Sequence, residues 1–191
     1  AQQNIEVLNM LNVKYIIGKD EQQQDIPLQN PEANGNAWFV KEIKKVANAD
    51  EMMREMKSFK SKETALAFTN DPISKTTFSV DSLAQIKLIN AQPNKLVYES
   101  TNSKDGFAVF SEMYYPKGWN ITINGKSTNM HEVNYTLRGL EIPAGINKIE
   151  FTFEPQVVKT GSLISLITSI IAVLAIFGGL FWKYKNKKQL A

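Results

Sequence analysis

The sequence of 191 residues contains no cysteine and a single histidine, His131. The absence of cysteine excludes disulfide bonds, zinc–thiolate sites and cysteine nucleophiles. The motifs of serine hydrolases, zinc peptidases, phosphate-binding loops and EF-hands are also missing. We therefore predict no catalytic residue, no metal ligand and no cofactor site in this chain. We interpret His131, which follows a turn, as a solvated loop residue.

The chain also has little excess charge, with 22 basic and 19 acidic residues. Four lysines near the C-terminus, at positions 183, 185, 187 and 188, account for the whole positive excess. A nucleic-acid-binding protein needs a basic face on its folded domain, so we predict no nucleic-acid partner. The lysine tail instead suits anionic lipid head groups.

One long apolar run stands out, the twenty uncharged residues Leu163–Trp182. Twenty helical residues reach roughly 30 Å, the thickness of the hydrocarbon core of a bilayer. Because lysines beside a spanning helix favour the cytoplasmic side, we expect the tail 183–191 inside and residues 1–158 outside. An outer domain without disulfides favours a bacterial inner membrane.

The start of the sequence, Ala1-Gln2-Gln3, resembles no export signal. An outer domain that precedes its anchor needs a signal peptide or an earlier spanning helix. We expect either a mature protein or the C-terminal piece of a longer one. Small residues recur at Gly161, Ser165 and Ser169, a spacing that allows close approach of another helix. This spacing gives mild support to a longer parent, whose upstream membrane helices are expected partners together with the bilayer.

The first 70 residues read as a small α+β segment. The pattern predicts a helix at 4–11, a strand at 13–17, a loop at 19–37, a strand at 38–46, a helix after Asn48 and a strand at 64–68. Asn48 and Glu51 resemble a capping box at the start of the second helix. The apolar face predicted for that helix consists of Met52, Met53, Met56 and Phe59.

From about residue 83 the apolar residues alternate with polar ones, as in strands with one buried face. Asn124-Gly125 predicts a tight hairpin turn. Several strands at short spacing predict an antiparallel β-sandwich over 83–155. The predicted fold is thus mainly β: a sandwich with a small α+β segment (1–70), followed by one transmembrane helix (163–182).

An aromatic cluster between two predicted strands is the candidate contact site for a glycan or acceptor. Its residues are Tyr114, Tyr115, Lys117 and Trp119, with Arg138 as a second cation. Aromatic faces stack on sugar rings, and a cation holds phosphate or carboxylate. The alternative is that these aromatics merely cover the sandwich, because Trp119 is in phase with the presumed buried residues Ile121 and Ile123.

Several stretches resemble the C-terminal end of the YfhO-like bacterial membrane proteins, particularly those of Bacteroidetes. They are LNMLNVKYII (8–17), NPEANGNAWFVKEIK (30–44), FAVFSEMYYPKGWNITINGK (107–126), NYTLRGLEIPAGINKIEFTFEP (134–155) and the final helix. The resemblance implies a long polytopic parent similar to GT-C glycosyltransferases. Such enzymes take sugars from polyprenyl-phosphate donors and act on cell-envelope glycans or lipids outside the membrane.

In that family the catalytic acidic residue lies in an early outer loop that this chain does not contain. The resemblance therefore implies a non-catalytic outer domain that contacts the acceptor. The alternative is a stand-alone, membrane-anchored β-sandwich module that binds glycan or protein. A membrane-anchored hydrolase is a third hypothesis, and it would need a pair of carboxylates facing each other across a cleft.

Overall fold

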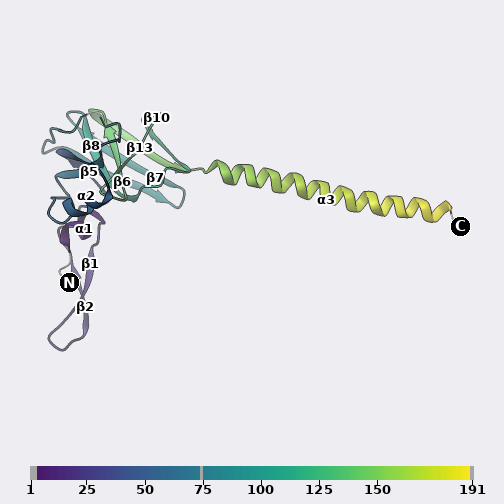
Figure 1. Ribbon diagram of the computed structural model, residues 1–191, viewed down its shortest axis with the longest axis horizontal. Coiled ribbons are helices and arrows are strands. Elements are labelled where there is room, and N and C mark those ends of the chain that lie inside the picture. The colour runs from purple at the N-terminus through teal and green to yellow at the C-terminus, as the bar shows by residue number, and fades with distance from the viewer. Residues whose placement is uncertain (1–3, 74, 190–191) are drawn as a thin grey trace. The chain divides into compact units, whose positions relative to one another are not determined.

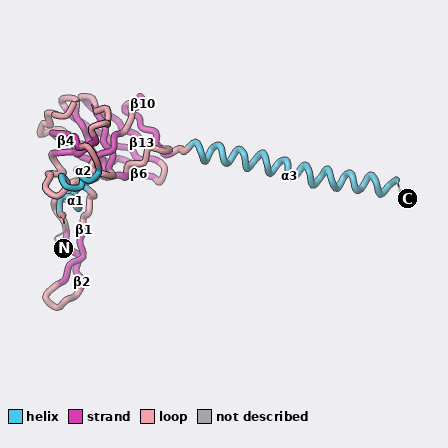
Figure 2. Tube along the Cα trace, in the orientation of Figure 1, coloured by secondary structure: helices cyan, strands magenta, loops and turns pink. Residues whose placement is uncertain are grey.

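The computed structural model describes residues 4–73 and 75–189 of the chain. The chain divides after Phe153 into two units, one rich in strands and the other a single helix (Figures 1 and 2). Each unit is described by itself below.

The first unit is built around two sheets. The five-stranded sheet has the order β10 (Lys126–Thr128), β9 (Trp119–Ile123), β13 (Gly145–Phe153), β7 (Lys95–Asn102), β6 (Gln85–Gln92). The six-stranded sheet has the order β3 (Ala37–Val40), β8 (Gly106–Met113), β12 (Leu137–Ile142), β11 (His131–Val133), β5 (Thr64–Phe68), β4 (Glu42–Val46). Neighbouring strands are antiparallel except β4 and β5, which are parallel. The predicted mainly β, sandwich-like class is confirmed.

The period-two pattern arises because alternate side chains of each strand point into the space between the sheets. In β9 and β13, Ile121 pairs with Phe151 and Ile123 with Ile149, and all four side chains are buried. At the end of β9, Asn124 and Gly125 both have positive φ, 51° and 78°. This confirms the predicted hairpin turn, whose two central residues need that backbone region.

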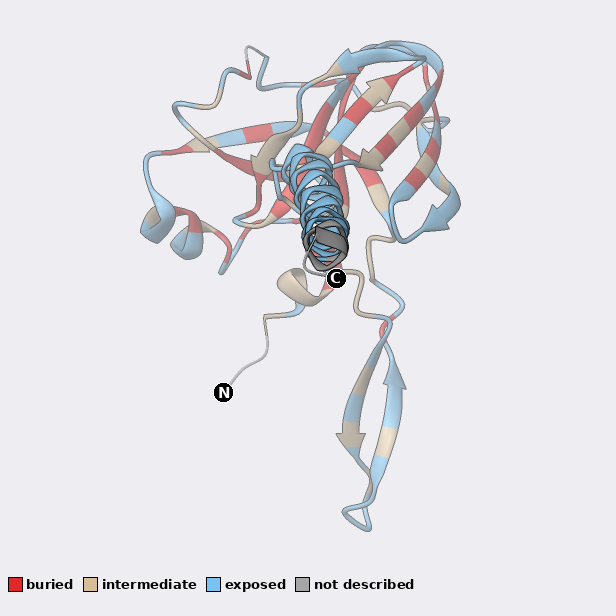
Figure 3. Cartoon of the chain, turned by 90° about the vertical axis from the view of Figure 1, so that its right-hand side faces the viewer, coloured by how far each residue is buried: buried red, intermediate tan, exposed pale blue. Residues whose placement is uncertain are grey.

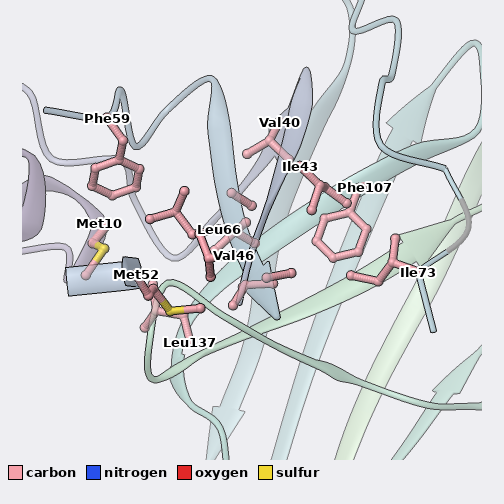
Figure 4. Close-up of a cluster of buried hydrophobic side chains, with 14 of the residues drawn as sticks. Met10, Val40, Ile43, Val46, Met52, Phe59, Leu66, Ile73, Phe107 and Leu137 are labelled. Carbon is pink, nitrogen blue, oxygen red and sulfur yellow. The ribbon is translucent and has the colours of Figure 1, made fainter. Parts of the chain in front are cut away.

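The six-stranded sheet is buried on both faces. In β8, Ala108 and Phe110 pack toward the five-stranded sheet, whereas Phe107 and Val109 belong to a second cluster. Figure 4 shows that cluster, which Met10 and Met52 complete from the helices α1 (Ile5–Met10) and α2 (Ala49–Glu55). The helices therefore cover the face of the sheet that the sandwich leaves open.

The two edge strands of this sheet, β3 and β4, are separated in the sequence by Lys41 alone. The sheet must therefore curl until its edges meet at this residue. The prediction of one strand over 38–46 is wrong, because the segment leaves one edge and enters the other at Lys41. The strands β3–β5, from the segment 1–70, share a sheet with β8, β11 and β12, so residues up to Phe153 form one compact unit.

Two local predictions near the N-terminus also differ from the structure. The segment 19–37, expected to be a loop, contains the strand β2 (Asp25–Gln29), which pairs with β1 (Tyr15–Lys19). Polar composition and Pro27 concealed it, because a two-stranded ribbon needs no continuous buried face. The helix α2 does begin at the predicted capping box, with the Glu51 amide donating to Asn48 Oδ1 over 2.9 Å. Met53, however, is half exposed, unlike its neighbour Met52 in the core.

The second unit contains the helix α3 (Gln156–Gln189). Its part Gln156–Lys183 is long and apolar enough to cross a membrane, and none of it is buried within the structure. The helix extends the predicted apolar run at its N-terminal end, where Lys159 Nζ lies 2.8 Å from Glu154 Oε2. This ion pair thus lies at the start of the helix, before the uncharged run Leu163–Trp182.

Candidate functional site

The candidate site is the connection that carries the chain from one sheet to the other, residues 114–118 between β8 and β9. The Tyr114 amide donates to the Thr136 carbonyl over 2.6 Å, which fixes the start of the connection beside β12. Gly118 has a φ of 109°, a conformation that side chains rarely adopt, and this lets the chain turn directly into β9. Tyr114 is therefore held by this hydrogen bond, and Trp119 by its place at the start of β9.

A surface hollow of about 300 Å³ lies against this connection. It is lined by Tyr114, Pro116, Trp119, Asn120, Ile121, Ser127, Thr128, Asn129 and Met130. Two aromatic rings and a methionine provide apolar walls, while hydroxyl and amide groups provide donors and acceptors. This is the combination that a sugar ring needs, since it offers apolar C–H faces and a polar edge.

Arg138 lies behind Trp119 and is only 3% exposed. It shares the inward face of β12 with Leu140 and Ile142 because alternate residues of a strand point the same way. Its guanidinium carbon lies 4.3 Å from the centroid of the Trp119 ring and 5.3 Å from that of Phe151. Arg138 Nε donates to the Met113 carbonyl over 2.8 Å. Aromatic faces and one hydrogen bond thus accommodate a cation inside the sandwich.

Burial dominates the electrostatics around Arg138. It lowers the pKa of the guanidinium itself, while Glu112 and Tyr98 oppose that shift. Burial also raises the pKa of Glu112, and the positive charge of Arg138 offsets this rise only in part. The pKa of Tyr98 is also raised, first by burial and then by Glu112. Arg138 Nη1 and Tyr98 Oη have no hydrogen-bond partner within the described chain, so the polar groups here are only partly satisfied.

The structure separates the five residues that the sequence grouped. Tyr114 and Trp119 line the hollow and are half-buried, and Trp119 also packs on Phe153 with ring centroids 5.2 Å apart. Tyr115 and Lys117 are exposed beside it. Arg138 lies beneath the surface. The sequence could not show this, because Met113, Trp119 and Phe151 come to Arg138 from three different strands.

The prediction of a solvated His131 is wrong. This residue begins β11, and its Nδ1 lies 2.5 Å from Asp71 Oδ1, with both side chains largely buried. Its ring also packs near that of Phe107, with centroids 5.9 Å apart. Sixty residues separate the two partners in the chain, so no local pattern could reveal the pair. It joins the segment after β5 to the neighbouring strand.

Nearby acids do not assemble further around this pair. Burial, with the charge of Asp71, raises the pKa of Glu132, and burial also raises the pKa of Tyr114. Within residues 4–73 and 75–189, no group of three or more histidine or acidic side chains is placed to hold a metal ion.

Together the two units define a class of protein, a β-sandwich module joined to a helix that is long enough to cross a membrane. The family model described as "Bacterial membrane protein YfhO" matches residues 54–165. The chain therefore belongs to the YfhO family of bacterial membrane proteins, as the resemblance in the sequence predicted.

A relative from Bacillus subtilis (strain 168), described as "Uncharacterized protein YfhO", is 33% identical over 88 residues. The matched region covers 46% of this chain but 10% of the relative. The chain thus spans about a tenth of the length of that curated protein. No solved structure matches the chain.

Proposed function

We propose that this chain is the outer C-terminal domain and last membrane helix of a polytopic YfhO-family protein, with residues 1–158 outside the inner membrane. Family membership, the apolar helix and the greater length of the relative support this proposal. The greater length of the relative also favours this proposal over a stand-alone, membrane-anchored module. The lysines that follow the helix favour a cytoplasmic tail.

The activity of the parent protein is proposed to be glycosyl transfer from a polyprenyl-phosphate sugar to a cell-envelope glycan or lipid. In this proposal the catalytic acid lies in an early outer loop of the parent protein, outside this chain. The outer domain contacts the acceptor without taking part in the chemistry. The upstream membrane helices and the bilayer are its other partners.

The observation that carries the acceptor proposal is the hollow beside residues 114–118. Tyr114 and Trp119 present aromatic surface in it, and the polar side chains of Asn120, Ser127, Thr128 and Asn129 also line it. The buried guanidinium of Arg138 contacts the ring of Trp119 and orients it, so the ring loses little freedom on binding. Exposed Tyr115 and Lys117 extend the contact surface, the second toward anionic groups on a glycan.

The test uses the whole chain in lipid nanodiscs, titrated calorimetrically with soluble hexasaccharides of glucose and of N-acetylglucosamine. We expect Tyr115→Ala to abolish binding without changing thermal stability, because Tyr115 is 50% exposed. Tyr135→Ala is the matched control, because this tyrosine is 48% exposed and, unlike Tyr115, does not belong to the connection 114–118 that borders the hollow. Equal effects of both variants, or no binding by the unmodified chain, would overturn the acceptor proposal.

A further inference from the structure

The hairpin formed by β1 and β2 has no covering layer. Among the residues that the structure describes, the two strands pair only with each other, and the ribbon projects from the rest of its unit with mostly exposed residues (Figure 3). At its tip the Asp20 carboxylate accepts hydrogen bonds from the amides of Gln22 and Gln24, over 2.8 and 2.9 Å. These two hydrogen bonds fix the conformation of the turn.

Both faces of this hairpin carry apolar side chains. Ile17 lies opposite Pro27, and on the same face Tyr15 precedes it by two residues. Tyr15 is 63% exposed and Ile17 77% exposed. On the other face Ile16 lies opposite Leu28. An isolated two-stranded hairpin is marginally stable in water, and contiguous exposed apolar surface marks an interaction site.

The base of the hairpin is fixed to the body by buried amides. Asn30 Nδ2 donates to Asn9 Oδ1 and to the Val13 carbonyl, both over 2.9 Å. The Asn30 amide also donates to the Lys14 carbonyl over 2.8 Å. These bonds set the direction of the ribbon before any partner binds, which lowers the entropic cost of docking.

We propose that the hairpin docks into an apolar groove with a basic rim, formed by the part of the same YfhO polypeptide that lies outside this chain. The relative of which this chain spans about a tenth leaves ample protein for such a groove. The charges at the tip of the hairpin indicate that the rim of the groove is basic. The segment 19–25 carries three carboxylates, those of Asp20, Glu21 and Asp25, and one ammonium, that of Lys19, whose Nζ lies 2.5 Å from Asp25 Oδ1. Lysine or arginine at the rim complements this excess.

A lipid surface fits the hairpin less well. Within the described part of the chain, the outer edge of each strand pairs with no other strand. A hydrocarbon layer cannot form hydrogen bonds with the backbone N–H and C=O groups of such an edge. The acidic tip is repelled by anionic head groups. A protein groove, in contrast, offers hydrogen-bond partners to the edges and apolar contacts to the faces.

The test is photo-crosslinking in cells, in the complete product of the gene that contains this sequence. A benzophenone amino acid replaces Ile17, and in a matched control it replaces Ile146, which is 73% exposed on β13. We expect the Ile17 position to give a crosslinked peptide that comes from the same polypeptide outside these 191 residues and contains lysine or arginine. A variant with Asp20, Glu21 and Asp25 changed to Asn, Gln and Asn should reduce the yield to that of the control.

Three outcomes would overturn the proposal. These are crosslinks only to lipid, crosslinks only to a second copy of the protein, and a yield at Ile17 no higher than at Ile146. If the Ile17 variant does not accumulate, the photoreactive residue is placed at Tyr15 on the same face, with the same outcomes.

Discussion

The guanidinium of Arg138 stacks 4.3 Å from the ring of Trp119, so a buried cation of one sheet holds an aromatic side chain of the other. Trp119 in turn forms part of the wall of the hollow beside residues 114–118. Its outer surface is available to a ligand while its inner surface is occupied by the cation. One contact therefore serves both the packing of the sandwich and the shape of its candidate site.

Removal of this cation should destabilise the fold. We expect Arg138→Met to lower the free energy of unfolding by about 2 kcal/mol, because the cation–π contact and the hydrogen bond to the Met113 carbonyl are both lost. Chemical denaturation of the whole chain in detergent, followed by tryptophan fluorescence, measures the change. Lys117→Met, on the exposed connection, is the control that also removes one positive charge. A loss no larger than that of the control would contradict the role assigned to Arg138.

The raised pKa of Glu112 predicts a defined pH dependence. The folded protein binds this proton more tightly than the unfolded chain, so stability falls as the pH rises from the ordinary value of about 4.3 through the raised one. Glu112→Gln removes this component. As the pH rises above the ordinary pKa of a glutamate side chain, the variant should therefore lose less free energy of unfolding than the unmodified chain.

Denaturant titrations at a series of pH values provide the comparison. Glu99→Gln, on the exposed side of β7, matches the loss of one carboxylate. Identical slopes for Glu112→Gln and the unmodified chain would show that the environment of Glu112 does not couple to folding.

The strands could be predicted where one sheet face is buried and the other wet. Ile121 and Ile123 alternate with polar residues, and Asn124-Gly125 ends their strand with a turn that depends on two residues only. These signals are local, so a single sequence contains them. The run 38–46 gave the right secondary structure but the wrong number of strands, because nothing local shows that a chain passes between two sheet edges at Lys41.

The candidate site was predicted as a set of residues and not as an arrangement. Arginine is normally exposed, and its burial here depends on Met113, Trp119 and Phe151, which the sheets bring together. In the same way His131 meets Asp71 only in the folded chain. Contacts between distant segments decide which polar groups are buried, and a sequence pattern of short range does not contain them.

The hydrogen bonds of Asn30 at the base of the β1–β2 hairpin should keep the hairpin ordered. We expect Asn30→Ala to lower the free energy of unfolding by about 1–3 kcal/mol, because the buried Asn9 amide loses its partner. Amide hydrogen exchange over residues 15–29 should accelerate in the variant. Asn120→Ala, on the exposed side of β9, is the control. Unchanged exchange in the hairpin would mean that the pairing of the two strands, and not the hydrogen bonds of Asn30, keeps it ordered.

The absence of cysteine makes the orientation of the chain directly testable. Single cysteines are introduced as Ile146→Cys, at an exposed position of the first unit, and as Gln189→Cys, near the lysine-rich end of α3. Lysines flanking a spanning helix favour the cytoplasmic side. A membrane-impermeant maleimide should therefore label the Ile146→Cys variant in intact spheroplasts. It should label the Gln189→Cys variant only after the membrane is permeabilised. The experiment uses the complete product of the gene that contains this sequence, and the same product without the introduced cysteine is the background control. Labelling of position 189 in intact spheroplasts would reverse the proposed topology and place the aromatic hollow on the cytoplasmic side, away from cell-envelope acceptors.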